Sequence, residues 1–155
     1  MLRKFISTFG LAVLGLLALN GCGGSSNHEL DVLHTRDVKL SDGAVIHAET
    51  AVQSEDLMRG LKYRESLAPD RGMIFFHSQE GHYPYWMFEC KISLDMIWMD
   101  HARRIVEIEA NVPPCLGAAE TCPSYGGHDE AMYVLELAAG QAAKHGLRKG
   151  QTLDF

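Results

Sequence analysis

Two aspartates and two histidines carry the side chains in this sequence that are best suited to catalysis. Asp95 and Asp100 can act as a general acid or base, with His82 or His128 as the proton partner. The aspartates are five residues apart, so on a regular strand they point to opposite faces and cannot form a carboxylate pair. One hypothesis is therefore a hydrolase or lyase that combines one aspartate with one histidine in a cleft beside residues 123–129.

Asp95 interrupts a mostly apolar alternating run, residues 92–99. A buried charge without a partner is unfavourable, so Asp95 is expected to contact a positive or hydrogen-bonding group. Arg59 and Arg64 are the candidate partners. Two roles for Asp95 are possible. In the first, one of these arginines forms a buried bidentate pair with Asp95 and fixes a helix to the sheet. In the second, Asp95 is the polar floor of a binding cleft.

Three aromatic residues, Tyr83, Tyr85 and Trp86, surround Pro84. Proline has no N–H to donate to a neighbouring strand, so this segment is expected at an edge or rim of the fold. Exposed aromatic rings there would stack on a sugar or a peptide. These three residues therefore join Asp95 and the two arginines as candidate ligand-binding residues. The alternative is that Trp86 belongs to the core.

The chain contains four cysteines. Cys115 and Cys122 flank a short loop, and a disulfide between them in an oxidising compartment would contribute about 2.5 kcal/mol. Cys22 is assigned to a lipid anchor, which leaves Cys90 free. Cys90 is either a small buried apolar residue or a reactive thiol. The first interpretation is favoured because the sequence shows no evident histidine or asparagine partner.

The sequence predicts no metal site and no cofactor. None of the eight histidines lies in a His-x-x-His or His-Glu-x-x-His pattern, and no Cys-x-x-Cys pair occurs. The formal net charge is −6 and no cluster of lysine and arginine is present, which argues against nucleic acid as a partner.

The N-terminus has the pattern of an exported protein. Residues 1–21 read as a signal peptide, with Arg3 and Lys4 before an apolar run over residues 9–19. This run is too short for an ordinary transmembrane helix. Leu19-Asn20-Gly21-Cys22 resembles the lipobox of bacterial lipoproteins, in which the cysteine becomes the lipid-modified first residue.

A lipid anchor at Cys22 implies an envelope location. Several acyl chains on one cysteine would hold the protein stably on a bilayer. Residues 22–29 would then be the lipidated cysteine with a flexible tether, and residues 30–155 a single globular domain. Gly23, rather than aspartate, follows Cys22, and by that resemblance the outer membrane is favoured.

Alternation and turn signals predict strands joined by short loops, with two helices. A hairpin is expected where residues 92–99 and Arg104–Ala110 flank a turn. The remaining predicted strands are Asp37–Leu40, Val45–Val52, Met73–His77, Ala131–Leu137 and Gln151–Phe155, and the predicted helices are Ser54–Leu67 and Gly140–His145.

Several separated motifs resemble one family, the domain of unknown function 192. They are Arg59-Gly60-Leu61, Gly72-Met73-Ile74-Phe75-Phe76, Trp86-Met87, Leu94-Asp95-Met96-Ile97 with Asp100, and Gly146-Leu147 through Gly150. The resemblance implies a small β-rich α+β domain, with a mixed sheet curled toward a barrel and one or two short helices. It implies no catalytic set. The chain departs from the usual pattern at Phe88-Glu89-Cys90.

The leading hypothesis is a lipid-anchored envelope protein that binds a ligand or partner without catalysis. Its partners would be the bilayer, through Cys22, and an envelope glycan, peptide or protein. One alternative is the hydrolase or lyase described above. A second alternative is a structural accessory of an envelope protein assembly.

Overall fold

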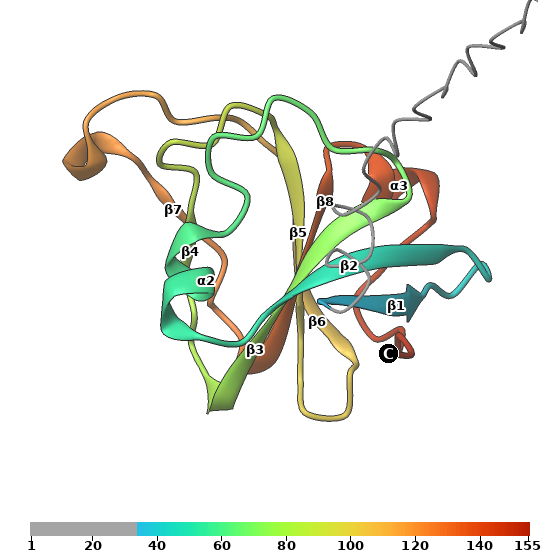
Figure 1. Cartoon of the computed structure of the whole chain (residues 1–155). Coiled ribbons are helices and arrows are strands. Elements are labelled where there is room, and N and C mark those ends of the chain that lie inside the picture. Colours follow the sequence, from blue (N-terminus) through green and yellow to red (C-terminus); the bar gives the residue numbers. More distant parts are fainter. Residues whose placement is uncertain (1–33) are drawn as a thin grey trace, which may run out of the picture.

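The computed structural model describes residues 34–155. The predicted signal peptide, Cys22 and the tether lie outside the described residues. The elements shown in Figure 1 are, in chain order, β1 (Thr35–Lys39), β2 (Val45–Ala51), α2 (Ser54–Arg59), β3 (Arg71–Gly81), β4 (Tyr85–Trp86), β5 (Leu94–Met99), β6 (Ile105–Val112), η1 (Ala119–Thr121), β7 (Ser124–Tyr125), β8 (Ala131–Ala138) and α3 (Gln141–Lys144).

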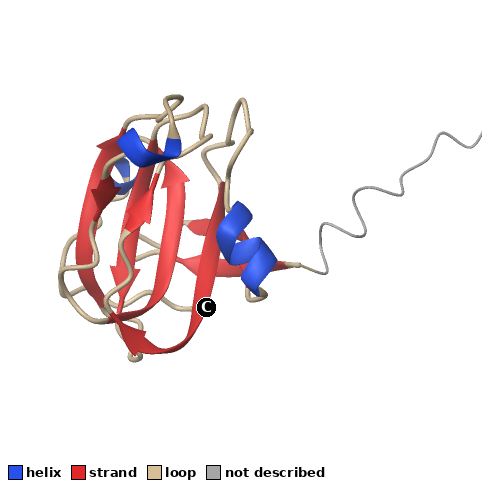
Figure 2. Ribbon diagram, turned by 90° about the vertical axis from the view of Figure 1, so that its left-hand side faces the viewer, coloured by secondary structure: helices blue, strands red, loops and turns tan. Residues whose placement is uncertain are grey.

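Most of the described chain is organised around one mixed sheet of six strands. Its order is β1-β2-β3-β8-β5-β6, and only the β2–β3 pair is parallel. Strands β4 and β7 form a separate two-stranded sheet. Figure 2 shows that strands dominate the domain and that the short helices lie at its periphery. The expected β-rich α+β class is confirmed.

Strand β5 has all six of its residues buried, which places it at the centre of two hydrophobic clusters. Alternation sends Ile97 into one cluster with Leu135, and Trp98 into the other with Val134. The pairing of β5 with β8 agrees with this division, because Ile97 lies opposite Leu135 and Trp98 lies opposite Val134. The predicted hairpin of β5 and β6 is confirmed.

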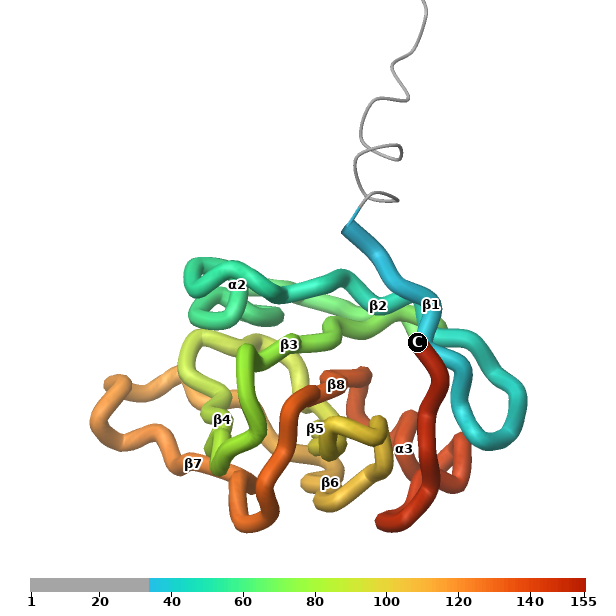
Figure 3. The backbone as a smooth tube through the Cα atoms, turned by 90° about the horizontal axis from the view of Figure 1, so that it is seen from below, coloured from blue at the N-terminus to red at the C-terminus, as the bar shows by residue number. Residues whose placement is uncertain are grey.

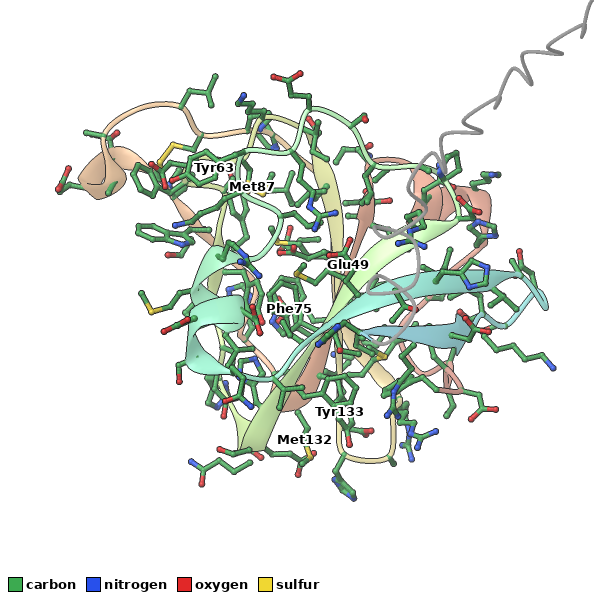
Figure 4. All side chains as sticks on the ribbon, viewed as in Figure 1. Glu49, Tyr63, Phe75, Met87, Met132 and Tyr133 are labelled. Carbon is green, nitrogen blue, oxygen red and sulfur yellow. A yellow bond between two sulfur atoms is a disulfide. The ribbon has the colours of Figure 1, made fainter. Side chains whose placement is uncertain are left out.

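The helix predicted over residues 54–67 is wrong in length, because α2 ends at Arg59. Gly60 follows with a φ of +49°, a conformation in which glycine is favoured and which ends the helix. A Cβ on Gly60 would lie 3.4 Å from the ring of Phe75. Phe75 points from β3 toward α2 (Figure 4). The close neighbour of this glycine is therefore an aromatic ring.

The last strand predicted, Gln151–Phe155, is also wrong, since this segment makes only isolated bridges. Thr152 bridges to Arg104, and Asp154 to Lys39. The Lys39 N–H donates to the Asp154 carbonyl at 2.7 Å, which holds the C-terminus beside β1 (Figure 3). The six-stranded sheet is not closed, and its curl toward a barrel stays a prediction.

The helices are short. None of the helices in residues 34–155 is long and apolar enough to cross a membrane.

Candidate functional site

The three aromatic residues that the sequence singled out lie together around one cavity. Its volume is about 310 Å³, and it lies between α2 and the segment around β4. We call it the aromatic cavity; its lining residues are Leu57, Met58, Lys62, His77, Tyr83, Pro84, Tyr85 and Trp86.

Glycines and one tryptophan hold the segment of residues 83–86 in place. The indole N–H of Trp98 donates to the carbonyl of Tyr83 at 2.8 Å. A Cβ on Gly126 would lie 2.5 Å from the Trp98 ring, and one on Gly127 would lie 2.6 Å from the Pro84 nitrogen. Both glycines have positive φ, so this loop can pass closely only because it lacks side chains there.

Ring contacts fix the inner wall of the aromatic cavity. His77 stacks on Tyr83 with 3.5 Å between ring centroids, and its Nε2 lies 3.2 Å from the Tyr85 hydroxyl. Tyr85 meets Phe75 and Trp98 edge to face, at 5.1 and 5.8 Å. Burial lowers the pKa of His77, so its imidazole is neutral at pH 7.

Trp86 lies at the mouth of the cavity and not in the core. It is 43% exposed. The Lys62 ammonium lies 5.6 Å from the Trp86 ring centroid and 5.1 Å from that of Phe88. The same ammonium is 3.5 Å from a carboxylate oxygen of Glu89. The rim therefore already holds a cation on its aromatic faces, which is a recognised attraction.

A second, smaller cavity of about 40 Å³ shares five lining residues with the aromatic cavity: Leu57, Met58, Lys62, Tyr85 and Trp86. We call it the Glu136 cavity, because it is also lined by Glu136, which is only 5% exposed. Burial raises the pKa of Glu136 to about 8, so its carboxyl is mostly protonated at pH 7.

Sequence reasoning missed Glu136, although a signal was present. It is the one charged residue in the apolar strand that runs from Val134 to Leu137. Glu136 lies between Leu135 and Leu137, and a charged side chain in such a strand is unfavourable unless it has a partner. What the sequence does not show is the cavity beside it, because that cavity is formed by α2, β3 and the residues around Cys90.

Cys90 lines the same small cavity and is the free cysteine of the described chain. It is buried, and burial together with the charge of Glu136 raises the pKa of its thiol to about 11. The thiolate form is therefore rare at pH 7. This agrees with a buried apolar residue and not with a reactive thiol.

Asp95 is fully buried, as expected, but its predicted partners are wrong. Its carboxylate accepts backbone N–H bonds from Asn111 and Ala142, both at 2.7 Å. Arg59 pairs with Asp56 at 2.7 Å instead. Arg64 pairs with both carboxylate oxygens of Glu49 at 2.6 Å.

The role of Asp95 is therefore to join the end of β6 and the start of α3 to β5. Asp95 and Arg64 line neither cavity, whereas Arg59 lines the Glu136 cavity at its exposed side. Of the six predicted binding residues, the structure thus brings together Tyr83, Tyr85, Trp86 and, at the margin, Arg59.

The aspartates and histidines of the hydrolase hypothesis have separate partners. Asp100 accepts from the N–H of Arg104 at 2.8 Å, and the Nδ1 of His82 lies 3.0 Å from the carbonyl of Gly127. His128 pairs with the carboxylate of Glu107 in β6. Within residues 34–155, no hydrogen bond joins either aspartate to either histidine.

The predicted disulfide is present between Cys115 and Cys122, whose Cα atoms are 5.8 Å apart. It closes the loop that contains η1. The backbone N–H of Cys115 donates to the carbonyl of Met87 at 3.1 Å, so the disulfide loop is attached to the chain just after β4.

The family DUF192, described as an uncharacterized group, matches residues 37–155. The chain belongs to this family. No curated protein matches it.

Two solved structures resemble this DUF192 domain. One is a protein of unknown function from Novosphingobium aromaticivorans, which is 30% identical with a TM-score of 0.67, over 78% of this chain and 84% of that one. The other, from Sinorhizobium meliloti, is described as a candidate transcription regulator; it is 28% identical with a TM-score of 0.65, over 76% of this chain and 89% of that one.

The DUF192 domain also brings three possible metal ligands together, a group that the sequence did not predict. Ligand atoms of Glu107, Glu109 and His128 lie within 4.8 Å of one another. The two glutamates alternate along β6, which the sequence shows, but His128 comes from a distant loop. Its ring is hydrogen-bonded to Glu107, which raises the pKa of His128. This pairing accounts for the cluster without a metal ion.

Proposed function

We propose that this protein is a cell-envelope lipoprotein whose DUF192 domain binds a glycan or peptide in the aromatic cavity, without catalysing a reaction. The observation that carries the proposal is the half-exposed Trp86 at the mouth of a cavity walled by Tyr83 and Tyr85. A cavity of about 310 Å³ is at the lower end of the range for small-ligand sites.

The chemistry of the walls supports a stacked ligand. Aromatic faces bind the apolar faces of sugars and the side chains of peptides, and the neutral His77 and the Tyr85 hydroxyl add hydrogen-bonding groups. Met58, another lining residue, is 75% exposed, so the cavity presents an apolar side chain to solvent.

The anchor and location are part of the proposal. Acylation of Cys22 attaches the chain to the bilayer, with the outer membrane favoured, and the tether allows the domain to reach its ligand. Labelling with palmitate tests this, because the Cys22→Ser variant should lose the label while the folded domain is retained. Incorporation of label by that variant would contradict the assignment.

Nucleic acid is not among the proposed ligands. The description of the Sinorhizobium protein as a candidate regulator finds no support in the charge of this chain, which is −6.

The curl of the sheet toward a barrel also belongs to the proposal, and it is supported by the C-terminal segment, which bridges to both Lys39 and Arg104.

Tryptophan fluorescence tests ligand binding directly, since the chain has two tryptophans. Trp98 is fully buried, so a ligand in the aromatic cavity should change mainly the emission of Trp86. Oligomers of N-acetylglucosamine and short peptides are the probes. We expect a saturable change in the unmodified protein and a much smaller one in Trp86→Phe.

Backbone chemical shifts provide the independent measurement. Ligand-induced shifts should cluster at residues 57–62 and 83–86. If neither glycans nor peptides alter any shift in these segments, the proposed function is wrong.

A further inference from the structure

Glu136 occupies an unusual position for a charged residue. On β8 it lies opposite Met73 of β3 on one side and Met96 of β5 on the other, in the middle of the six-stranded sheet. Gly72 allows this packing, because a Cβ there would lie 2.7 Å from the Glu136 carbonyl. Among residues 34–155, no side chain or backbone group forms a hydrogen bond or ion pair with its carboxyl.

The Glu136 cavity is the place where a partner for this carboxyl can enter. Burying a carboxylate without a partner is strongly unfavourable, so the group is held in its neutral form until one arrives. Apart from Glu136 and the two cations Arg59 and Lys62, its lining is apolar or aromatic: Leu57, Met58, Gly60, Leu61, Phe75, Tyr85, Trp86 and Cys90. Its volume of about 40 Å³ accommodates one group the size of water or ammonium.

The two cations at the edge of this cavity are already paired. Arg59 is bound to Asp56 at 2.7 Å, and Lys62 lies 3.5 Å from Glu89. Lys62 also shows what the rim accepts, since its ammonium rests over the rings of Trp86 and Phe88. A second ammonium that enters the site would meet aromatic faces and then the unpaired carboxyl.

We propose that Glu136 binds the primary ammonium group of a lysine side chain in a peptide ligand, whose methylene stem lies in the aromatic cavity. This inference rests on the proposed function and specifies the ligand class. The two cavities share five lining residues, so the stem and the ammonium would occupy adjacent spaces.

An ammonium fits the site better than a neutral donor does. Hydrogen bonds between two charged groups are about twice as strong as those between neutral groups, and aromatic faces attract cations. The proton balance is simple. The Glu136 carboxyl releases its proton to solvent, and the carboxylate that remains pairs with the ammonium, which keeps all three of its hydrogens.

Calorimetry and NMR titration of the full chain test the proposal with three matched tripeptides, each blocked at both ends. The central residue is lysine, norleucine, which has a similar stem without the ammonium, or ε-acetyl-lysine, which is uncharged. We expect the lysyl peptide to bind at least tenfold more tightly than the other two. Its affinity should also rise by roughly tenfold or more from pH 6 to pH 8, as Glu136 loses its proton.

Glu136→Gln should lower the affinity for the lysyl peptide to that for the norleucyl peptide and remove the dependence on pH. Glu120→Gln is the control, because Glu120 lies in η1 and lines neither cavity, yet the replacement of a carboxyl group by an amide is the same. The pH dependence is measured on unmodified protein, so it tests the inference even if Glu136→Gln folds poorly.

The outcomes separate this inference from the proposed function. Equal binding of the lysyl and norleucyl peptides, or unchanged binding in Glu136→Gln, would refute the ammonium site while leaving the aromatic cavity as a peptide site. Binding of N-acetylglucosamine oligomers but of no peptide would refute the ammonium site and favour a glycan. Binding of no probe at all would refute both.

Discussion

Replacing Glu136 with glutamine should change how the stability of the protein depends on pH. Burial raises the pKa of Glu136 from 4.5 to about 8. The folded state therefore holds a proton that the unfolded state releases between these values. The favourable contribution of the neutral carboxyl is fully present below pH 4.5 and is lost as the pH rises toward 8.

The size of the effect follows from the shift. One pKa unit corresponds to 1.36 kcal/mol, so a rise from 4.5 to about 8 corresponds to about 4 to 5 kcal/mol. Glutamine has nearly the shape of the protonated glutamate and cannot ionise. We expect Glu136→Gln and the unmodified protein to differ by less than about 1 kcal/mol at pH 4. At pH 8 the variant should be more stable by several kcal/mol.

Urea unfolding at intervals between pH 4 and pH 8 measures this difference. Subtracting the two curves removes the contribution of the surface histidines, which are the same in both proteins. Glu120→Gln is again the control for the replacement of a carboxyl group by an amide outside both cavities. A difference between Glu136→Gln and the unmodified protein that does not change between pH 4 and pH 8 would show that Glu136 is ionised or paired in the folded state, contrary to our reasoning.

Three further changes test the structure. Asp95→Asn places an amide N–H₂ against one of two backbone donors and should lower the free energy of unfolding by about 2 to 4 kcal/mol in urea; a loss below about 0.5 kcal/mol would contradict the buried contacts. Replacing Cys115 and Cys122 with serine should lower stability by about 2.5 kcal/mol and should leave ligand affinity within about twofold. Gly126→Ala should be destabilising by at least about 1 kcal/mol and should alter the emission of Trp98, since its Cβ would lie 2.5 Å from that ring; unchanged emission and stability would refute the close approach.

The features that the sequence predicted correctly depend on local patterns. The β5–β6 hairpin was predictable because apolar side chains alternate over the strands and a polar turn separates them. The aromatic site was predictable in part, because Pro84 marks a rim and aromatic residues surround it. The disulfide was predictable from the short spacing of Cys115 and Cys122.

The features that the sequence did not predict depend on contacts between distant segments. Asp95 was correctly expected to be buried, but its donors are backbone N–H groups, and any residue type can supply those. One of them belongs to Asn111, which has a φ of +55° beside a register shift in the β5–β6 ladder. The sequence does not show where such an irregularity falls, so an arginine was the natural but incorrect expectation.

The bridges made by the C-terminal segment have a consequence for the order of folding. Asp154 pairs with Lys39, so this contact joins residues at nearly opposite ends of the described chain. Contacts of such long sequence separation carry a large loop-closure entropy and form late. During synthesis from the N-terminus, the Lys39 end of β1 would lack this partner until the final residues emerge. Removal of the last few residues should therefore expose the backbone groups of Lys39 at the edge of the sheet and favour pairing with other chains.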